Sequence, residues 1–183
     1  MAIRVIGGEC KGFMLKGPPG EGTRPILARV RKSMFDILTP YLKDSVFLDL
    51  FCGTGAVGIE ALSRGAQSLV SVELDKRVCD CIRWNLNYCK MIDESEVICT
   101  DVFEFLRAFD RQKFDIVFAG PPYPAYFCEG ILDALDHCHF LKDNTVILLQ
   151  HHIKEILPEE TKKLRKYRDK KYGDTILSFY KIV

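Results

Sequence analysis

The feature that most constrains the fold is an alternation of short apolar runs with helix-like segments between residues 45 and 150. The apolar runs are rich in Val, Ile, Leu and Phe, which favours strands. Strands that are apolar throughout and are separated by helices are typical of a parallel sheet covered on both faces. We expect strands at 45–50, 68–73, 96–100, 114–119 and 145–150, and helices at 55–64, 75–88, 102–109 and 128–135.

The pattern changes at both ends of the chain. Residues 164–172 and 175–182 look like antiparallel strands joined by Gly173 and Asp174, a two-residue loop in which glycine supplies a positive φ. Residues 4–6 and 13–15 flank a glycine-rich turn and are expected to form another hairpin, with a helix at 29–38 after it. The sequence therefore predicts an α/β, Rossmann-like fold, a mostly parallel seven-stranded sheet with an antiparallel C-terminal hairpin.

A glycine-rich turn follows the first expected strand of the central region. Gly53, Gly55 and Gly58 satisfy the spacing G-x-G-x-x-G, and such glycines let a ligand approach the backbone at the start of a helix. Asp49 lies four residues before the first of them. Its charge would repel a pyrophosphate and attract an ammonium group. This favours S-adenosylmethionine, which has an ammonium, a sulfonium and no phosphate, over NAD.

Acidic residues also follow the next two strands, and ligands of such sheets bind at these carboxyl ends. Glu73 comes twenty residues after Gly53, the position of a carboxylate that accepts both ribose hydroxyls in NAD and S-adenosylmethionine proteins alike. Asp101 is placed to accept a hydrogen bond from an adenine amino group. Either acid could instead only cap the helix that follows it. Together with the glycine turn, they indicate a nucleoside pocket.

The fourth expected strand ends in an unusually stiff corner, Gly120-Pro121-Pro122-Tyr123. Each proline fixes its own φ and restricts the residue before it, so the backbone carbonyls there are aimed in advance. Such carbonyls can accept hydrogen bonds from an amino group, and Tyr123 can stack on a base that has been taken out of its helix.

At this corner the sequence resembles the class I methyltransferases that modify exocyclic amino groups of bases. It is similar, over nearly its whole length, to the family that methylates guanine N2 in bacterial small-subunit (16S) ribosomal RNA. The motifs that carry the resemblance are Arg4-Val5-Ile6-Gly7-Gly8, Lys11-Gly12, Thr23-Arg24-Pro25, Arg29-Val30, Met34-Phe35, Ile37-Leu38, 47–55, 58–66 and Tyr172-Gly173-Asp174-Thr175.

The resemblance implies the class I methyltransferase fold, S-adenosylmethionine as cofactor and ribosomal RNA as partner. It implies a small RNA-contacting N-terminal extension (1–40) and a cofactor-binding domain (41–183). The cofactor contacts it implies are Asp49, Phe51, Gly53, Gly55, Glu73, Leu74, Asp101 and Val102, and the catalytic corner is Gly120, Pro121, Pro122 and Tyr123.

The chain departs from the family at Gly120, where an aspartate or asparagine is expected. Glycine has no side-chain acceptor, and losing one preorganised partner of this kind can cost about 10²- to 10³-fold in rate. Three explanations are open: a slow enzyme, another acceptor or a water in its place, or a ribosome-assembly factor that binds RNA without methylating it. We favour the enzyme and expect Gly120→Asp to raise its rate.

Charge is segregated along the chain. Residues 1–33 carry seven basic and two acidic side chains, residues 160–183 carry eight and three, and the remainder has a net charge of −9. Basic ends favour a polyanionic partner such as RNA. We expect phosphate contacts from Arg4, Lys11, Lys16, Arg24, Arg29, Arg31 and Lys32, with help from Lys166, Arg168, Lys170 and Lys171.

The cysteines and the hydropathy of the sequence indicate the cellular compartment. The eight cysteines are scattered, without zinc-site spacing, so we expect reduced thiols and no metal. No apolar run approaches the roughly 20 residues of a membrane span, and the start of the chain leads into no signal-peptide core. We therefore expect a cytoplasmic protein, and we also expect a monomer.

Overall fold

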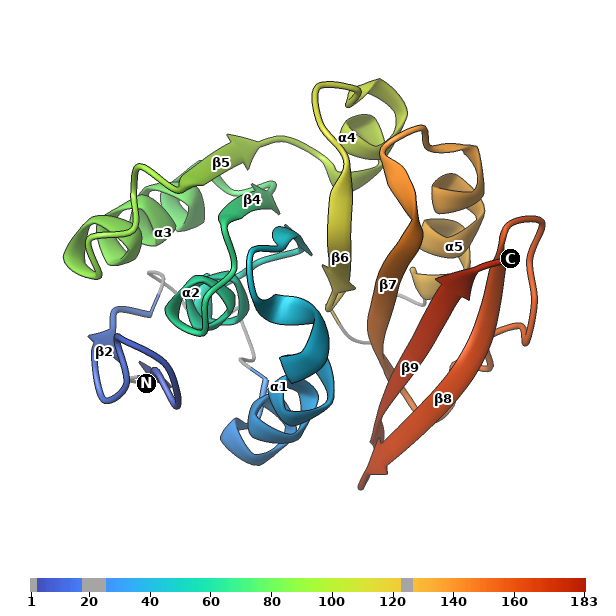
Figure 1. The fold of residues 1–183 in the computed structure, drawn as a ribbon, viewed down its shortest axis with the longest axis horizontal. Helices are drawn as coiled ribbons and strands as arrows, with labels where there is room; N and C mark the ends of the chain where they lie inside the picture. Colours follow the sequence, from blue (N-terminus) through green and yellow to red (C-terminus); the bar gives the residue numbers. More distant parts are fainter. Residues whose placement is uncertain (1–2, 18–25, 123–126) are drawn as a thin grey trace.

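The computed structural model describes residues 3–17, 26–122 and 127–183. Strands and helices alternate through most of the chain (Figure 1). The strands are β1 (Ile3–Arg4), β2 (Met14–Leu15), β3 (Val46–Leu50), β4 (Ser68–Glu73), β5 (Ser95–Cys99), β6 (Phe114–Ala119), β7 (Leu141–His152), β8 (Leu164–Tyr172) and β9 (Thr175–Ile182). The helices are α1 (Ala28–Leu42), α2 (Ala56–Ser63), α3 (Lys76–Tyr88), α4 (Val102–Ala108) and α5 (Cys128–His137).

Seven strands form one sheet in the order β5-β4-β3-β6-β7-β9-β8. The strands from β5 to β7 pair in parallel, whereas β9 pairs antiparallel with both β7 and β8. Strands β1 and β2 form a separate two-stranded hairpin. These findings confirm the predicted α/β, Rossmann-like fold with its seven-stranded sheet and antiparallel C-terminal hairpin.

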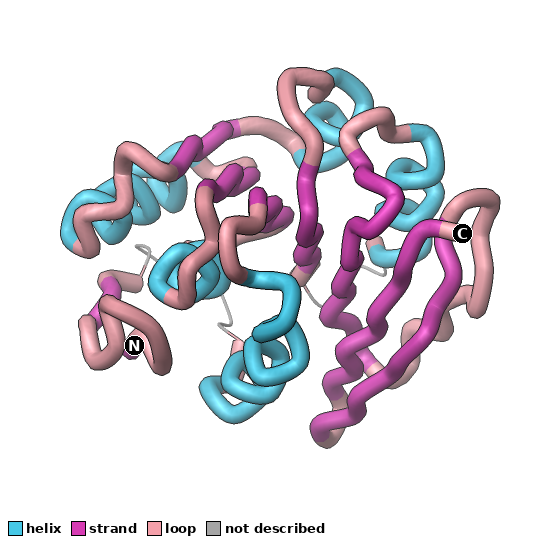
Figure 2. The backbone as a smooth tube through the Cα atoms, viewed as in Figure 1, coloured by secondary structure: helices cyan, strands magenta, loops and turns pink. Residues whose placement is uncertain are grey.

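Helices cover both faces of the sheet (Figure 2). Helices α1, α2 and α3 pack through residues such as Phe35, Ile59 and Ile82 on one face. Helices α4 and α5 pack through residues such as Phe105 and Leu132 on the other. The parallel strands are therefore buried on both sides, which explains why their sequences are almost continuously apolar.

Two elements extend by more than two residues beyond the ranges that the sequence pattern predicts. Strand β7 begins at Leu141 because it already pairs with Phe114 of β6, before a register shift, and it ends at His152, paired with Thr175. Helix α1 continues to Leu42 even though it contains Pro40. The carbonyl of Phe35 there accepts a hydrogen bond from the Thr39 hydroxyl (2.8 Å). Pairing with distant strands extends β7, and Leu42 at the end of α1 is buried in the apolar cluster that also contains Phe47 of the sheet; local sequence shows neither.

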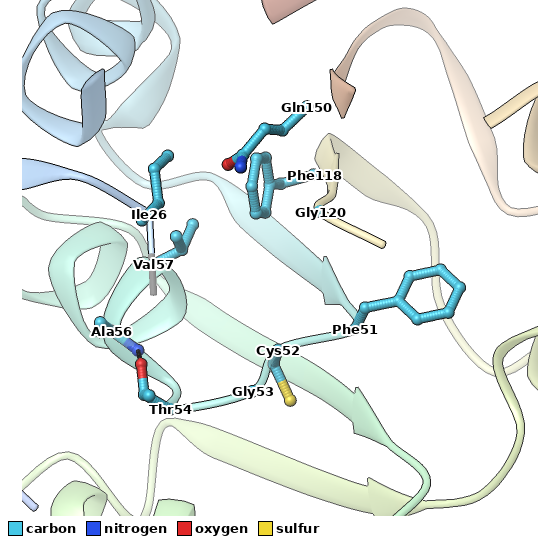
Figure 3. A pocket seen from close by; sticks show the side chains of 10 residues that line it. All are labelled: Ile26, Phe51, Cys52, Gly53, Thr54, Ala56, Val57, Phe118, Gly120 and Gln150. Carbon is cyan, nitrogen blue, oxygen red and sulfur yellow. Dashed lines mark hydrogen bonds between the residues drawn. The ribbon is translucent and has the colours of Figure 1, made fainter. Parts of the chain in front are cut away.

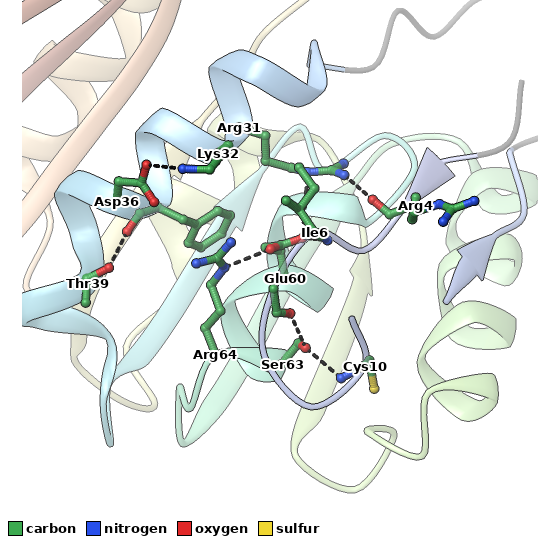
Figure 4. Close-up of polar contacts among 12 residues, drawn as sticks. Arg4, Ile6, Cys10, Arg31, Lys32, Asp36, Thr39, Glu60, Ser63 and Arg64 are labelled. Atoms are coloured by element: carbon green, nitrogen blue, oxygen red, sulfur yellow. Dashed lines mark hydrogen bonds and ion pairs between the residues drawn. The ribbon is translucent and has the colours of Figure 1, made fainter. Parts of the chain in front are cut away.

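The N-terminal hairpin is hydrogen-bonded to the end of α2 (Figure 4). The Ser63 carbonyl accepts a hydrogen bond from the Glu9 N–H (2.8 Å), and the Ser63 hydroxyl accepts one from the Cys10 N–H (2.9 Å). Gly8 has φ +75°, and a Cβ on it would lie 1.6 Å from the Ser63 carbonyl oxygen. Only glycine allows so close an approach. The backbone of the hairpin is therefore in direct contact with the end of α2 at Ser63.

A buried ion cluster lies beside this contact. Glu60, fully buried on α2, accepts hydrogen bonds from the Ile6 N–H (2.8 Å) and the Arg64 Nε (2.7 Å), and it lies 3.8 Å from the Arg31 Nε. Arg31, on α1, also donates to the Arg4 carbonyl. The cluster therefore joins the hairpin, α1 and α2 through a single carboxylate.

The eight cysteines are free thiols, and six of them are buried. Within the described ranges, no cluster of His, Cys, Asp or Glu is placed to hold a metal ion. No helix in the same part of the chain is long and apolar enough to cross a membrane.

Candidate functional site

The chain reverses its direction of strand addition between β3 and β6. It adds β4 and β5 on one side of β3, then returns to place β6 on the other. A crevice forms at such a point, outside the carboxyl ends of the two strands. Leu50 pairs with Val72 and Ala119, and Ala119 pairs with Leu149. The residues that follow these partners, Glu73, Phe51, Gly120 and Gln150, are therefore brought to the same edge of the sheet.

The turn after β3 is tightly wound at this edge. Phe51, Gly53 and Gly55 all have positive φ, at 59°, 51° and 73°. A left-handed backbone at phenylalanine is uncommon and costs of the order of 1–3 kcal/mol. A pocket opens against the turn (Figure 3), lined by Ile26, Phe51, Cys52, Gly53, Thr54, Ala56, Val57, Phe118, Gly120 and Gln150. The strained turn thus forms one wall of a pocket.

Glu73 braces this turn from the neighbouring strand. Its Oε2 accepts a hydrogen bond from the Gly53 N–H (3.0 Å), and its Oε1 accepts from the N–H groups of Leu74 (2.9 Å) and Asp75 (3.2 Å). An ionised carboxylate has about four acceptor positions. One position, on Oε2, is therefore left for a ligand hydroxyl in this conformation.

The next strand end contributes two further predicted cofactor contacts, Asp101 and Val102. The Asp101 Oδ1 caps α4 by accepting from the N–H groups of Phe103 (2.8 Å) and Glu104 (3.1 Å), which leaves Oδ2 for another donor. Val102 is buried, whereas Leu74, between β4 and α3, is 67% exposed. Asp101 therefore has the capping role that was open from sequence, and an adenine contact stays a prediction.

Asp49 lies deeper than the other acids. Its side chain is fully buried, and its Oδ2 accepts a hydrogen bond from the Gly58 N–H (3.0 Å). Its Oδ1 has no partner among the described residues, and neither has the hydroxyl of Ser71, its register partner on β4. Burial raises the pKa of Asp49 to about 8, against the lowering effect of the Gly58 hydrogen bond.

This burial predicts a pH-dependent stability. The pKa of Asp49 is about 3.8 when unfolded and about 8 when folded, so the unfolded chain releases the proton first. The carboxyl therefore lowers stability progressively as pH rises from about 4 to about 8, by roughly 1 kcal/mol per unit. Asp49→Asn should raise the melting temperature more at pH 8 than at pH 5. Thermal unfolding at both values measures this, and an equal shift at both would contradict it.

The proline corner closes the crevice on the side of β6. The Gly120 N–H donates to the Leu50 carbonyl of β3 (3.4 Å), Pro121 is buried and Pro122 is exposed. A Cβ on Gly120 would lie 3.1 Å from the Phe118 ring, so a larger residue requires the ring to move by a few tenths of an ångström. Tyr123 lies outside the described residues.

The pocket also contains residues that the sequence analysis did not select. Gln150, at the end of β7, and Phe118, in β6, point into it (Figure 3). Gln150 is a polar residue directly after the apolar run 146–149. It could have been found by examining the end of the fifth strand as closely as the ends of the others.

The basic side chains predicted to contact RNA fall into different environments. Arg4, Lys11, Arg29 and Lys170 are exposed, which leaves their role a prediction, and Arg24 lies outside the described residues. The prediction is wrong for Arg31, which is 2% exposed and committed to Glu60 and the Arg4 carbonyl. It is also wrong for Lys166, whose largely buried side chain pairs with Glu159 and Asp169.

Comparison with known proteins agrees with this geometry. The family model described as Conserved hypothetical protein 95 matches residues 3–181. The ribosomal RNA small subunit methyltransferase D of Escherichia coli is 32% identical over 178 residues, 97% of this chain and 89% of that protein. The solved yhhF chain of Escherichia coli is 30% identical and superposes with a TM-score of 0.89 over 100% of this chain and 98% of that one.

A more distant neighbour shares the fold. An RNA methyltransferase of Salinibacter ruber, solved in complex with S-adenosyl-L-homocysteine, is 17% identical, with a TM-score of 0.67 over 87% of this chain and 94% of that one. Its likeness supports the class I methyltransferase fold alone. The family match and the identity to the Escherichia coli enzyme, each over nearly the whole chain, show that this protein belongs to the family of the ribosomal RNA small subunit methyltransferases D.

Proposed function

We propose that this protein transfers a methyl group from S-adenosylmethionine to the exocyclic N2 amine of a guanine in small-subunit (16S) ribosomal RNA. The observation that carries the proposal is the crevice at the β3–β6 switch, where the strained glycine turn, Glu73 and the proline corner converge. The proteins similar to this chain include ribosomal RNA methyltransferases and RNA methyltransferases of the same fold.

The residues present fit S-adenosylmethionine. Glu73 is held in place by the Gly53 N–H and keeps one acceptor position for a ribose hydroxyl. Asp49 has an unpartnered oxygen behind the turn, and because burial raises its pKa to about 8, a bound cation would favour its ionised form whereas a phosphate would oppose it. Leu74 offers exposed apolar surface to an adenine ring beside Asp101. When bound, the cofactor supplies a methyl group activated by its sulfonium.

The opposite wall must make guanine N2 reactive. This nitrogen is a poor nucleophile because its lone pair is delocalised into the ring. A base that has left its stack can be held in the crevice, where the carbonyls of the Gly120-Pro121 corner accept hydrogen bonds from the amino group. Tyr123 is proposed to stack on the base, an interaction worth roughly 1–3 kcal/mol. Proximity of the two reactants supplies much of the remaining acceleration.

Binding and transfer experiments separate this function from its rivals. Calorimetry should show binding of S-adenosylhomocysteine and none of NAD; the reverse would indicate an oxidoreductase. Tritium from labelled S-adenosylmethionine should then enter unmethylated small-subunit particles. RNA binding without methyl transfer would indicate a ribosome-assembly factor, the alternative function that the missing side-chain acceptor at Gly120 leaves open.

The partner is proposed to be small-subunit ribosomal RNA, either free or in an assembling 30S particle. The protein is proposed to bind it as a monomer in the cytoplasm. Residues 1–40 are proposed to be the RNA-contacting extension and residues 41–183 the cofactor-binding domain. Helix α1 spans this boundary, and its Met34 and Phe35 belong to the same apolar cluster as Phe47 of the sheet. The extension is thus packed on the domain that it serves.

RNA binding is expected to weaken steeply with salt. Each phosphate contact to a single strand contributes about −0.7 to the slope of log K against log salt. Arg29, exposed beside the crevice, is expected to make one such contact. Arg29→Ala should reduce the slope by about one phosphate contact in fluorescence titrations at several salt concentrations. Arg107→Ala, which removes an exposed arginine paired with Glu104 on α4, is the control and should leave the slope unchanged. A salt-independent affinity would contradict the contact.

A further inference from the structure

We infer that Gln150 supplies the side-chain acceptor that Gly120 lacks, and that it contacts the amine which receives the methyl group. This inference rests on the proposed function and deepens it by naming a catalytic residue. The corner after β6 carries no polar side chain at position 120. A replacement acceptor must therefore come from another element at the same edge.

Strand register brings Gln150 to that place. Ala119 of β6 pairs with Leu149 of β7, so Gly120 and Gln150 are the next residues on adjacent parallel strands. A Cβ built on Gly120 would lie 3.9 Å from the Gln150 Oε1. Figure 3 shows the Gln150 amide next to the Phe118 ring. The amide oxygen thus reaches the region that an aspartate or asparagine side chain at position 120 would occupy.

Gln150 also lies where two depressions meet. One is the pocket against the glycine turn, on the side proposed for the cofactor. The other is a groove that includes Arg29, Tyr172 and Asp174, on the side proposed for RNA. Ile26 and Gln150 line both of them. Methyl transfer requires the donor from one side and the amine from the other to meet at such a junction.

The amide has unused hydrogen-bonding capacity. Gln150 is half-buried, and no residue in the described ranges forms a hydrogen bond with its side chain. Partly buried amides normally have partners, so a free one aimed into a pocket is available to a ligand. The neighbouring Phe118 residue is 3% exposed. The amide oxygen is therefore available to accept a hydrogen bond from a ligand in the pocket.

The role of this oxygen in the step is limited and specific. The N2 lone pair forms the new N–C bond, the electron pair of the breaking C–S bond stays on sulfur, and the nitrogen then loses a proton to solvent. The Gln150 Oε1 accepts a hydrogen bond from an N2–H throughout. This draws the lone pair out of the ring as the nitrogen becomes tetrahedral, and it requires no charge on the side chain.

Substitution of Gln150 tests the inference in the full-length protein. Gln150→Leu removes the acceptor at similar volume and should lower kcat about 10²-fold, while the affinity for S-adenosylhomocysteine in calorimetry stays within about twofold. Gln150→Glu keeps an acceptor and should recover most of this loss. Gln67→Leu, the same change at the exposed amino-terminal edge of β4, is the matched control and should have unaltered kcat.

A double-mutant cycle makes the test sharper. If Gln150 and an acid at position 120 serve the same amine, Gly120→Asp should raise kcat more in the Gln150→Leu background than in the parent. An equal factor in both backgrounds, or a Gln150→Leu enzyme with parental kcat, would overturn the inference and leave the proposed function intact. A parent chain that binds S-adenosylhomocysteine but transfers no methyl would overturn both, and this is seen before any variant is made.

Discussion

Glu60→Ala is expected to lower the free energy of unfolding by about 3–5 kcal/mol, because it leaves the buried guanidinium of Arg31 without its carboxylate partner. Glu60 is fully buried, Arg31 is 2% exposed, and both are hydrogen-bonded or paired within the cluster of Figure 4. The substitution also leaves the Ile6 N–H without its acceptor. Burial already lowers the pKa of Arg31 against the opposing effect of Glu60, so this guanidinium depends on its partner.

Urea denaturation monitored by circular dichroism measures this loss. The control is Asp36→Ala, which breaks the exposed pair between Asp36 and Lys32 on α1 and should change stability by less than about 1 kcal/mol. Glu60→Gln keeps an acceptor for the Ile6 N–H and should lose less than Glu60→Ala. If Glu60→Ala were as mild as Asp36→Ala, the cluster would not hold the hairpin, α1 and α2 together.

Glu73→Ala is expected to weaken binding of S-adenosylhomocysteine by about 100-fold or more. A hydrogen bond to a charged acceptor is worth roughly 1.5–3 kcal/mol, and Glu73 is proposed to accept from the ribose while it braces the Gly53 N–H. The loss therefore combines a missing ligand contact with a looser turn.

Calorimetric titration of the purified variant gives this affinity directly. Glu96→Ala is the control, since Glu96 is an exposed acid on the adjacent strand β5 whose partner is Arg111. It should bind like the parent. Parental affinity in Glu73→Ala would mean that the sugar lies elsewhere and that the nucleoside pocket is misplaced.

Two kinds of element were predicted well from the sequence: strands whose apolar runs are buried on both faces, and the C-terminal hairpin, whose predicted strands 164–172 and 175–182 have the limits of β8 and β9. The runs 68–73 and 114–119 have the same limits as β4 and β6 in the structure. The glycine turn was predictable because positive φ restricts the choice of residue, and both Gly53 and Gly55 have it.

The parts that were not predictable depend on contacts between distant residues. From the sequence alone, Arg31 was expected to be one of several exposed basic side chains. The fold instead places it against Glu60 and the Arg4 carbonyl. Gln150 gains its meaning only when β7 pairs with β6 and brings it beside Gly120. Likewise, Asp49 was expected to face a ligand. Its burial, and its hydrogen bond from the Gly58 N–H, become evident only in the folded structure.

The central claim is tested most directly by identifying the methylated nucleoside. Small-subunit particles lacking the modification are incubated with the protein and isotopically labelled S-adenosylmethionine, and the RNA is digested and analysed by mass spectrometry. The account predicts label in N2-methylguanosine from a single site of the ribosomal RNA. Label in any other nucleoside, or none above a protein-free control, would contradict it.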